Sequence, residues 1–364
     1  VELIDVRENK QLWGENFTRK ISDVQLLQTD ISREITENLR LRLSGTQTQQ
    51  LAGQGTTNPQ AYEMLLKGRF YFNTPGGFRK AIEYYEQAIA ADPNYALAYA
   101  DLAEGYNFLG GGIVRREEAV RKALELDPNL ADAHLQLAEI KRDKWEWQEA
   151  EREYRRAIEL NPNHPRAYRG YAIYLGVLGR HDEAVANIKR SKELDPVSRI
   201  TGNDAGLVFR WARRYDEAIA ALRQVIELKQ NSAVTHTRLG SVYAAKGMNR
   251  EAIAEYQEAI RMGGGGRSSP RLGAAYAKAD ERGKAEEILQ KLIAKGESLT
   301  YESAVLYDAL SMRDEAFAEL EKAYAARDWD LPSIGVDPNY DNLRPDPRFA
   351  DLLRRMNLPP TISN

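Results

Sequence analysis

The chain has 364 residues, of which 43% are hydrophobic and 29% charged, and its formal net charge is −3. These values are typical of a globular protein with a substantial core, and they argue against a general nucleic-acid binder, which carries a clear basic excess. The absence of cysteine excludes disulfides, thiolate metal sites and cysteine nucleophiles. No apolar run approaches the roughly 18 residues that a membrane-spanning helix needs. Because the chain starts at Val1 with neither methionine nor signal peptide, we expect a cytoplasmic fragment or processed chain.

The first 43 residues have the patterns of two strands and a helix. VELIDV and LWGENFTRK are expected to form a β-hairpin around the turn RENKQ. A helix is expected from Ser22, where Gln25 can complete a capping box. Its apolar stripe has helical spacing and consists of Val24, Leu27, Ile31, Ile35 and Leu39. The polar stretch 44–59, rich in Gln, Gly and Thr, is predicted to be a linker.

A phrase with proline recurs from residue 90 onward. AADPN, ELDPN, ELNPN and ELDPV place Pro93, Pro128, Pro162 and Pro196 at separations of 35, 34 and 34 residues. A second marker, in phase with the first, is an alanine that opens a helical run. These alanines are Ala81, Ala150, Ala184, Ala218, Ala252, Ala285 and Ala316. A period of about 34 residues predicts repeated helix–turn–helix units.

Residues 131–164 show the content of one unit. Leu137, Ala138 and Ile140 mark the packing side of a first helix. Ala150, Tyr154 and Ala157 recur at intervals of four and three along a second helix, where small alanines allow close backbone approach and the tyrosine fills the space between helices. Asn161-Pro162 then ends the second helix, since the residue before proline is pushed out of helical geometry.

This pattern resembles the tetratricopeptide repeat. The family's small residue in the first helix matches Ala103, Ala138, Ala172, Gly206, Gly240 and Gly273. Its aromatic residue in that helix matches Tyr106, Phe209, Tyr243, Tyr276 and Tyr307. The resemblance implies an all-α, right-handed superhelix of about eight repeats between residues 60 and 330. The second unit is irregular, with Arg116 where alanine is expected, and the glycine run 263–266 is interpreted as a helix stop and hinge after the sixth.

Both ends of the chain also resemble parts of a known architecture. Residues 1–43 resemble the tail of a TolB-like domain, and such domains precede tetratricopeptide repeats in some bacterial signalling proteins. The proline-rich stretch 331–364 is similar to the closing segment of the same proteins. Its helix, expected over 348–356, should cover the apolar face of the last repeat, as the end of a solenoid requires. An isolated hairpin would have an open edge, which suggests a homodimer formed through that edge.

The resemblance implies a ligand groove along the first helices of the repeats, on the concave wall. Carried over position by position, it implies a basic and polar wall made of Arg166, Arg169, Asn203, Arg210, Trp211, Thr237, Arg238, Arg267 and Arg271. It also implies an acidic wall in the earlier units, made of Asp101, Glu104, Asp132 and Glu139. Arginine forks suit carboxylates, so we expect an acidic or bipolar peptide. The alternative is that these arginines are solvated or paired with neighbouring carboxylates.

No pattern in the sequence predicts a catalytic site, a metal site or a cofactor. The four histidines are scattered without metal-ligand spacing, and the glycine-rich stretches lack the context of a phosphate-binding loop. Trp145 and Trp147, in a turn between helices, are expected to pack rather than to anchor a ligand. The leading hypothesis is therefore a protein-interaction scaffold within a larger bacterial signalling protein. A self-association module is the alternative, and an enzyme is the least favoured class.

Overall fold

The computed structural model describes residues 2–5, 10–14, 55–74, 76–109, 112–229, 231–294 and 301–359. At the N-terminus its backbone has two short strands, β1 (Glu2–Asp5) and β2 (Lys10–Gly14), paired antiparallel with an irregularity between Leu3 and Ile4. The helix expected from Ser22 and most of the expected linker lie outside the described residues.

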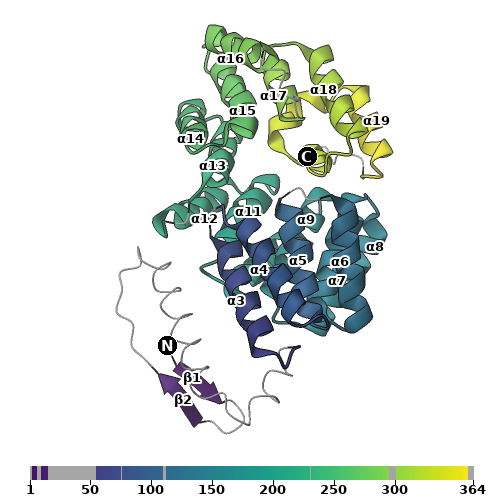
Figure 1. Cartoon of the computed structure of the whole chain (residues 1–364). Helices are drawn as coiled ribbons and strands as arrows, with labels where there is room; N and C mark the ends of the chain where they lie inside the picture. Colours follow the sequence, from purple (N-terminus) through teal and green to yellow (C-terminus); the bar gives the residue numbers. More distant parts are fainter. Residues whose placement is uncertain are drawn as a thin grey trace.

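From residue 59 onward the described chain is a succession of helices (Figure 1). They pair as first and second helices of eight units: α3 (Pro59–Asn73) and α4 (Phe78–Ala91), α5 (Ala96–Phe108) and α6 (Ile113–Leu126), α7 (Ala131–Asp143) and α8 (Trp147–Leu160), α9 (Pro165–Val177) and α10 (His181–Leu194), α11 (Arg199–Trp211) and α12 (Tyr215–Glu227), α13 (Ala233–Ala245) and α14 (Asn249–Arg261), α15 (Gly265–Lys278) and α16 (Arg282–Ala294), and α17 (Tyr301–Ala309) and α18 (Arg313–Ala325). The predicted all-α array of helix–turn–helix repeats is therefore confirmed.

The recurring small and large residues explain how the two helices of a unit pack. Ala150, Tyr154 and Ala157 on α8 are fully buried, and the Tyr154 ring lies against Tyr171 and Tyr174 of α9. The glycines at the small position are required by the same packing. A Cβ on Gly240 would approach the Tyr256 ring to 2.8 Å, closer than real Cβ atoms come. The repeat period in the sequence thus corresponds to the packing of a large residue on one helix against a small residue on a neighbouring helix.

One residue with positive φ closes most of the turns between the two helices of a unit. These residues are Trp145, Gly179, Arg213, Gly247, Asp280 and Ser311. A left-handed conformation is unfavourable for a bulky residue such as tryptophan. Packing holds Trp145 in place, since its side chain is buried and its ring contacts Tyr324, far along the chain. The expectation that Trp145 and Trp147 pack is confirmed.

The glycine run after the sixth unit, interpreted from the sequence as a helix stop and hinge, lies at the junction of α14 and α15. Gly263 has φ of 90° and ends the turn after α14, but α15 begins at Gly265 and contains Gly266. The run therefore stops one helix and starts the next within a few residues.

The segment after α18 folds back onto the solenoid. It contains two 3₁₀ helices, η2 (Leu331–Gly335) and η3 (Pro338–Leu343), and a last helix, α19 (Pro347–Arg355). Figure 1 shows this segment in yellow between two parts of the array, α3–α11 below and α13–α18 above. The α19 helix packs on α18 and buries Phe349, Leu352 and Leu353. One hydrophobic cluster consequently extends from Leu135 in the third unit to Leu358.

Candidate protein-binding surfaces

The acidic residues of the early concave wall lie against arginines of a later unit. Arg166 on α9 contacts three carboxylates at once: Asp101 (3.0 Å) and Glu104 on α5, and Asp132 on α7. Asp101 and Glu104 are only 1% and 2% exposed. The helices α5 and α9 are separated by a whole unit. These ion pairs therefore connect three successive units across the early concave wall.

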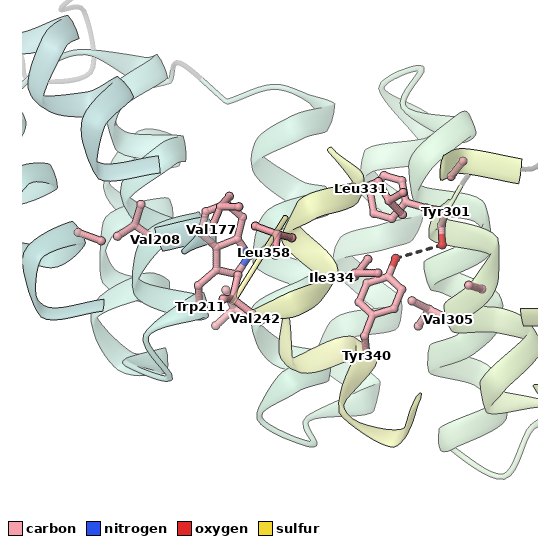
Figure 2. Packing of buried hydrophobic residues seen from close by; sticks show 14 of the residues in the cluster. Val177, Val208, Trp211, Val242, Tyr301, Val305, Leu331, Ile334, Tyr340 and Leu358 are labelled. Carbon is pink, nitrogen blue, oxygen red and sulfur yellow. Dashed lines mark hydrogen bonds between the residues drawn. The ribbon is translucent and has the colours of Figure 1, made fainter. Parts of the chain in front are cut away.

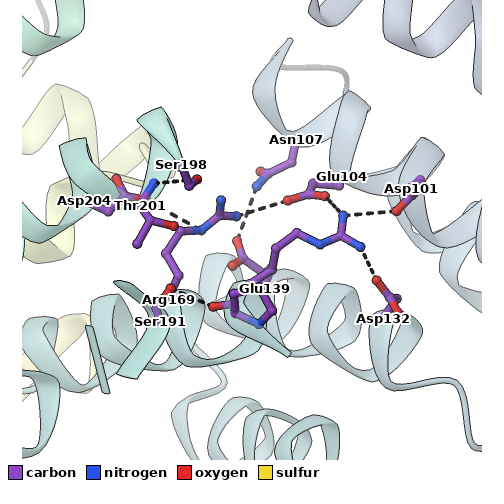
Figure 3. A network of polar contacts seen from close by, with 12 residues as sticks. Asp101, Glu104, Asn107, Asp132, Glu139, Arg169, Ser191, Ser198, Thr201 and Asp204 are labelled. Atoms are coloured by element: carbon purple, nitrogen blue, oxygen red, sulfur yellow. Dashed lines mark hydrogen bonds and ion pairs between the residues drawn. The ribbon is translucent and has the colours of Figure 1, made fainter. Parts of the chain in front are cut away.

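A second arginine extends this network toward the middle of the array. Arg169 donates to Glu104 at 3.0 Å and lies 3.7 Å from Asp204 on α11, as Figure 3 shows. Asp204 in turn accepts from Arg238 on α13 at 2.6 Å. Glu139 accepts a hydrogen bond from Asn107 at 3.3 Å and pairs with Arg142 of its own helix. The predicted acidic wall and the first part of the predicted basic wall therefore neutralise each other.

The pKa of Asp132 reflects the strength of this pairing. Burial alone raises the pKa of a carboxyl group. At Asp132 the facing Arg166 guanidinium and the His164 ring, whose Nε2 lies 3.2 Å from Oδ1, outweigh burial and hold the pKa well below its usual range. The carboxylate is consequently charged throughout the neutral range and acts as a fixed partner of Arg166.

The later part of the predicted basic wall is occupied by the C-terminal segment. Arg210 on α11 donates to Asp337 at 2.8 Å, and both side chains are buried. Arg271 on α15 is also buried, and its charge acts on Asp337 and on Tyr340. Arg267, the most exposed of these arginines, pairs with Asp330 at 2.5 Å. Burial raises the pKa of Asp337, but the Arg210 and Arg271 charges outweigh it and keep the pKa below its usual value.

The three remaining residues of the predicted groove are satisfied by neighbours or packed in the core. Trp211 is 3% exposed and lies beside Val177, Val242 and Leu358 in the apolar cluster (Figure 2). The Thr237 hydroxyl contacts the Ser268 hydroxyl at 2.7 Å. Asn203 is buried on α11, and its Oδ1 atom has no hydrogen-bond partner among the described residues. None of these three side chains is presented on an open surface.

Apolar side chains of the C-terminal segment fill the space between the two parts of the array. Figure 2 shows Leu331, Ile334, Tyr340 and Leu358 between the Trp211 side and the Tyr301 side, where the Tyr340 hydroxyl donates to the Tyr301 carbonyl at 3.1 Å. On the other side, the Trp147 indole donates to the Met356 carbonyl at 2.9 Å, across 209 residues.

These contacts occupy side chains that the resemblance assigns to a ligand groove. Every arginine predicted for the groove contacts a carboxylate or is buried beside one, which is the alternative reading of the sequence. The sequence predicts a C-terminal helix over the last repeat, whereas η2 and η3 of this segment also contact α9 and α13. In Asp337-Pro338-Asn339 the Asp337 carboxylate caps the first turn of η3, which predicts a local turn but not where the segment docks.

An open groove lies elsewhere, between α6 and α7. Its volume is about 610 Å³. The floor is apolar, and a charged rim surrounds it. The floor residues are Val120, Leu124, Leu137 and Ile140, and Val114, which is 62% exposed, lies at the edge. The rim residues are Glu117, Glu118, Arg121, Glu125 and Lys141.

The second unit departs from the repeat pattern beside this groove. Other units have a buried alanine at the start of the second helix, whereas α6 has Arg116, which reaches across to Asp143 at 2.5 Å. Four residues later α6 has Val120, where the two neighbouring units have Tyr85 and Tyr154. Val120 is buried and forms part of the apolar floor.

The C-terminal segment begins with a carboxyl group whose ionisation opposes folding. Burial, reinforced by the charges of Asp330 and Glu302, raises the pKa of Asp328 to about 6. Since the folded pKa lies above the unfolded value near 3.9, the native state loses stability as the pH rises from about 4 to 6.

We expect Asp328→Asn to remove this loss, because the amide keeps the acceptor that holds the Asp330 backbone N–H at 2.9 Å. At pH 7.5 the free energy of unfolding should rise by about 1–2 kcal/mol, from the 1.4 kcal/mol that each pKa unit represents, discounted for partial solvent exposure. Urea unfolding at pH 4 and pH 7.5 checks this. A gain of the same size at both pH values would contradict the assignment to Asp328 ionisation.

Within the described residues, no group of three or more His, Asp or Glu side chains is placed to hold a metal ion. None of the helices among these residues is both long and apolar enough to cross a membrane.

Comparison with known families identifies the repeat. Residues 65–95, 135–198 and 203–267 match models of the tetratricopeptide repeat. The helical array is thus a solenoid that contains tetratricopeptide repeats, as the sequence predicted.

Among the proteins that are similar to this chain, two illustrate the likeness in sequence and in fold. One is a putative adenylate cyclase 3 of Rhizobium meliloti (strain 1021), which is 27% identical over 105 residues; the match covers 28% of this chain and 18% of that protein. The other is a chain in the crystal structure of the APC/C hetero-tetramer Cut9–Hcn1, with a TM-score of 0.58 and 18% identity, covering 80% of this chain and 55% of that chain. At this identity the structural likeness shows the fold alone.

Proposed function

We propose that this chain is a protein-interaction scaffold and that a partner helix docks in the groove between α6 and α7. The observation that supports this proposal most directly is the groove, which has an open apolar floor between two helices of a repeat fold. An amphipathic helix suits this shape, since its apolar face covers the floor while its polar flanks meet the rim. On the rim Glu117 pairs with Lys144 and Glu125 with Arg121, both near the surface. Glu118 is exposed, so a basic residue beside the partner's apolar stripe complements Glu118.

The early concave wall supports a partner site less well than the sequence suggested. A ligand carboxylate there would have to displace a carboxylate of helix α5 from Arg166 or Arg169. Truncating one member of a buried pair leaves the other charge uncompensated, so such displacement is costly. The open groove binds without that cost.

We also propose that the chain is the regulatory part of a larger signalling protein. Residues 1–43 resemble the tail of a TolB-like domain, and the similar protein from Rhizobium meliloti carries the name of a nucleotide cyclase. Both are consistent with a repeat region that regulates an attached or associated signalling domain. An acidic partner and a homodimer through the N-terminal hairpin stay predictions of the sequence.

The test is a paired substitution on the exposed edge of the groove. Val114→Arg with Glu118→Arg places two cations at exposed positions, so the fold should be retained. A matched control is Ile293→Arg with Glu287→Arg on α16, which also changes one exposed apolar residue and one exposed glutamate.

Proteins cross-linked to the wild-type chain and to each variant in source cells are then compared by quantitative mass spectrometry. We expect the partner to be retained by the control and reduced at least tenfold by the groove variant, because two positive charges are placed beside its basic flank. Equal recovery with both variants would contradict the groove as the docking site. Light scattering at several concentrations separates this outcome from self-association.

A further inference from the structure

The C-terminal segment contacts the later concave wall in the manner of a bound peptide. Residues 331–343 contain two short 3₁₀ helices, and Leu331, Ile334, Tyr340 and Leu343 are fully buried. The η2 and η3 helices contact α9, α13, α17 and α18, which are distributed over several units of the array. A simple end cap would need to cover only the last unit, and α19 already does so through α18.

One carboxylate of this segment faces two buried cations. Asp337 accepts from Arg210 Nη2 at 2.8 Å, and Arg271 adds a second positive charge nearby. Arg210 Nη1 is buried and has no hydrogen-bond partner among the described residues. A void of about 10 Å³ beside Arg271 and Asn339 has room for about one water molecule. The donors of this wall therefore exceed what the single Asp337 side chain satisfies.

The pairing of Asp337 with these arginines specifies the position of the C-terminal segment more than it stabilises the fold. Two desolvated arginines around one carboxylate recover little net free energy, whereas an apolar cap would be as stable or more so. A buried ion pair does specify register, because only a segment with a carboxylate at this point satisfies the arginines. Tyr340, three residues after Asp337, supplies a second point of recognition through its hydrogen bond to the Tyr301 carbonyl.

We propose that the wall of α11, α13, α15 and α17 is a peptide-recognition site that reads an aspartate followed three residues later by a tyrosine, and that residues 331–343 occupy this site in cis. The ligand in trans is an acidic partner segment with the same spacing, Asp-Pro-x-Tyr, which replaces the chain's own segment. This site is separate from the α6–α7 groove and does not depend on it.

The test uses a fluorescent synthetic peptide with the sequence of residues 331–345, LPSIGVDPNYDNLRP, added to the full chain. Wild-type chain should bind it weakly, because the cis segment fills the site. The full-chain variant Asp337→Asn keeps the shape of its segment but loses the carboxylate, so it should bind the peptide at least tenfold tighter. Adding Arg210→Met to that variant should abolish the gain.

Matched peptides separate recognition from general charge. A peptide with Asp337→Asn should bind the Asp337→Asn chain at least tenfold more weakly than the natural peptide, as expected for one lost charge-assisted hydrogen bond. A peptide with Asp341→Asn, a position that is 44% exposed in the chain, should bind within about threefold of the natural peptide. If the folded Asp337→Asn chain binds the natural peptide no better than wild type does, the segment is a structural closure only and the proposal is wrong.

A second measurement covers the case in which Asp337→Asn does not fold. Hydrogen exchange of the wild-type chain is followed with and without a large excess of the peptide. We expect the amides of residues 331–343 to exchange faster when the peptide is present, while α9–α13 keep their protection. If the hydrogen-exchange rates of residues 331–343 do not change at saturating peptide, the proposal that a partner peptide replaces the chain's own segment is wrong.

Discussion

Replacing Arg166 with alanine should destabilise the free protein by about 3 kcal/mol, at the lower end of the 3–5 kcal/mol typical of breaking a buried ion pair from one side. The reason is the crowding of carboxylates around this guanidinium. Asp101 and Glu104 are almost fully buried, and Asp132 lies beside them on the next unit. Arg69 and Arg169 still compensate part of the charge, which is why the lower end applies.

The control for this prediction is Arg152→Ala on α8. Arg152 is 71% exposed and lies 3.5 Å from Glu149, so its removal should change the free energy of unfolding by no more than about 0.5 kcal/mol. Urea unfolding followed by circular dichroism measures both. If Arg166→Ala were as stable as wild type or more stable, Arg166 would not be needed for the fold. That result would favour the ligand-binding role that the sequence predicted for it.

Replacing Tyr154 with alanine should destabilise the protein even more than Arg166→Ala does, by about 4 kcal/mol. Large aromatic-to-alanine changes in a core cost about 3–5 kcal/mol through lost burial and the cavity that remains. Tyr154 is completely buried between the two helices of its unit and α9, where its ring packs on Tyr171 and Tyr174.

Tyr154→Phe isolates the ring from the hydroxyl. Among the described residues, the hydroxyl accepts one long hydrogen bond, from Arg142 at 3.5 Å, so its removal should cost less than about 1 kcal/mol. Because repeat proteins can unfold in parts, the same variants should be examined by hydrogen exchange. Loss of protection confined to α7–α10 supports the local role of Tyr154, whereas unchanged protection in Tyr154→Ala would contradict it.

The repeats could be predicted from sequence because their packing is local. Ala150 and Tyr154 contact helices within the same or the next unit, so the period of about 34 residues contains the information needed to place them. The same holds for Gly240, which must be small because Tyr256 of its own unit lies against it. Helix existence and the packing side of each helix follow from this periodicity.

The use of the concave wall could not be predicted in the same way. Whether Arg210 faces solvent or a carboxylate depends on Asp337, 127 residues later, and on how far the array curves. Similarly, the turn context of Trp147 predicts packing, but its hydrogen-bond partner Met356 is 209 residues away. Position within a repeat identifies which side chains point to the inner wall, and only the three-dimensional arrangement shows what fills it.

The groove between α6 and α7 illustrates a third case. Arg116 is an evident exception to the repeat pattern, yet the sequence alone does not indicate what the exception does. In the structure Arg116 reaches Asp143 on α7, beside an open groove with an apolar floor. A departure from the repeat pattern can thus coincide with a surface that the regular units lack.

The C-terminal segment lies along the later concave wall, and one cross-linking measurement tests this placement directly. The chain has no cysteine, so Arg213→Cys with Asp341→Cys introduces a unique pair of cysteines. The two positions are partly exposed, and in the structure Arg213 Nη1 lies 2.8 Å from Asp341 Oδ2. At low protein concentration, a short bismaleimide should cross-link the two cysteines within one chain in high yield, whereas each single-cysteine variant should give no such product. Absence of the intramolecular cross-link in the folded double variant, or cross-links only between chains, would contradict a segment that occupies its own wall.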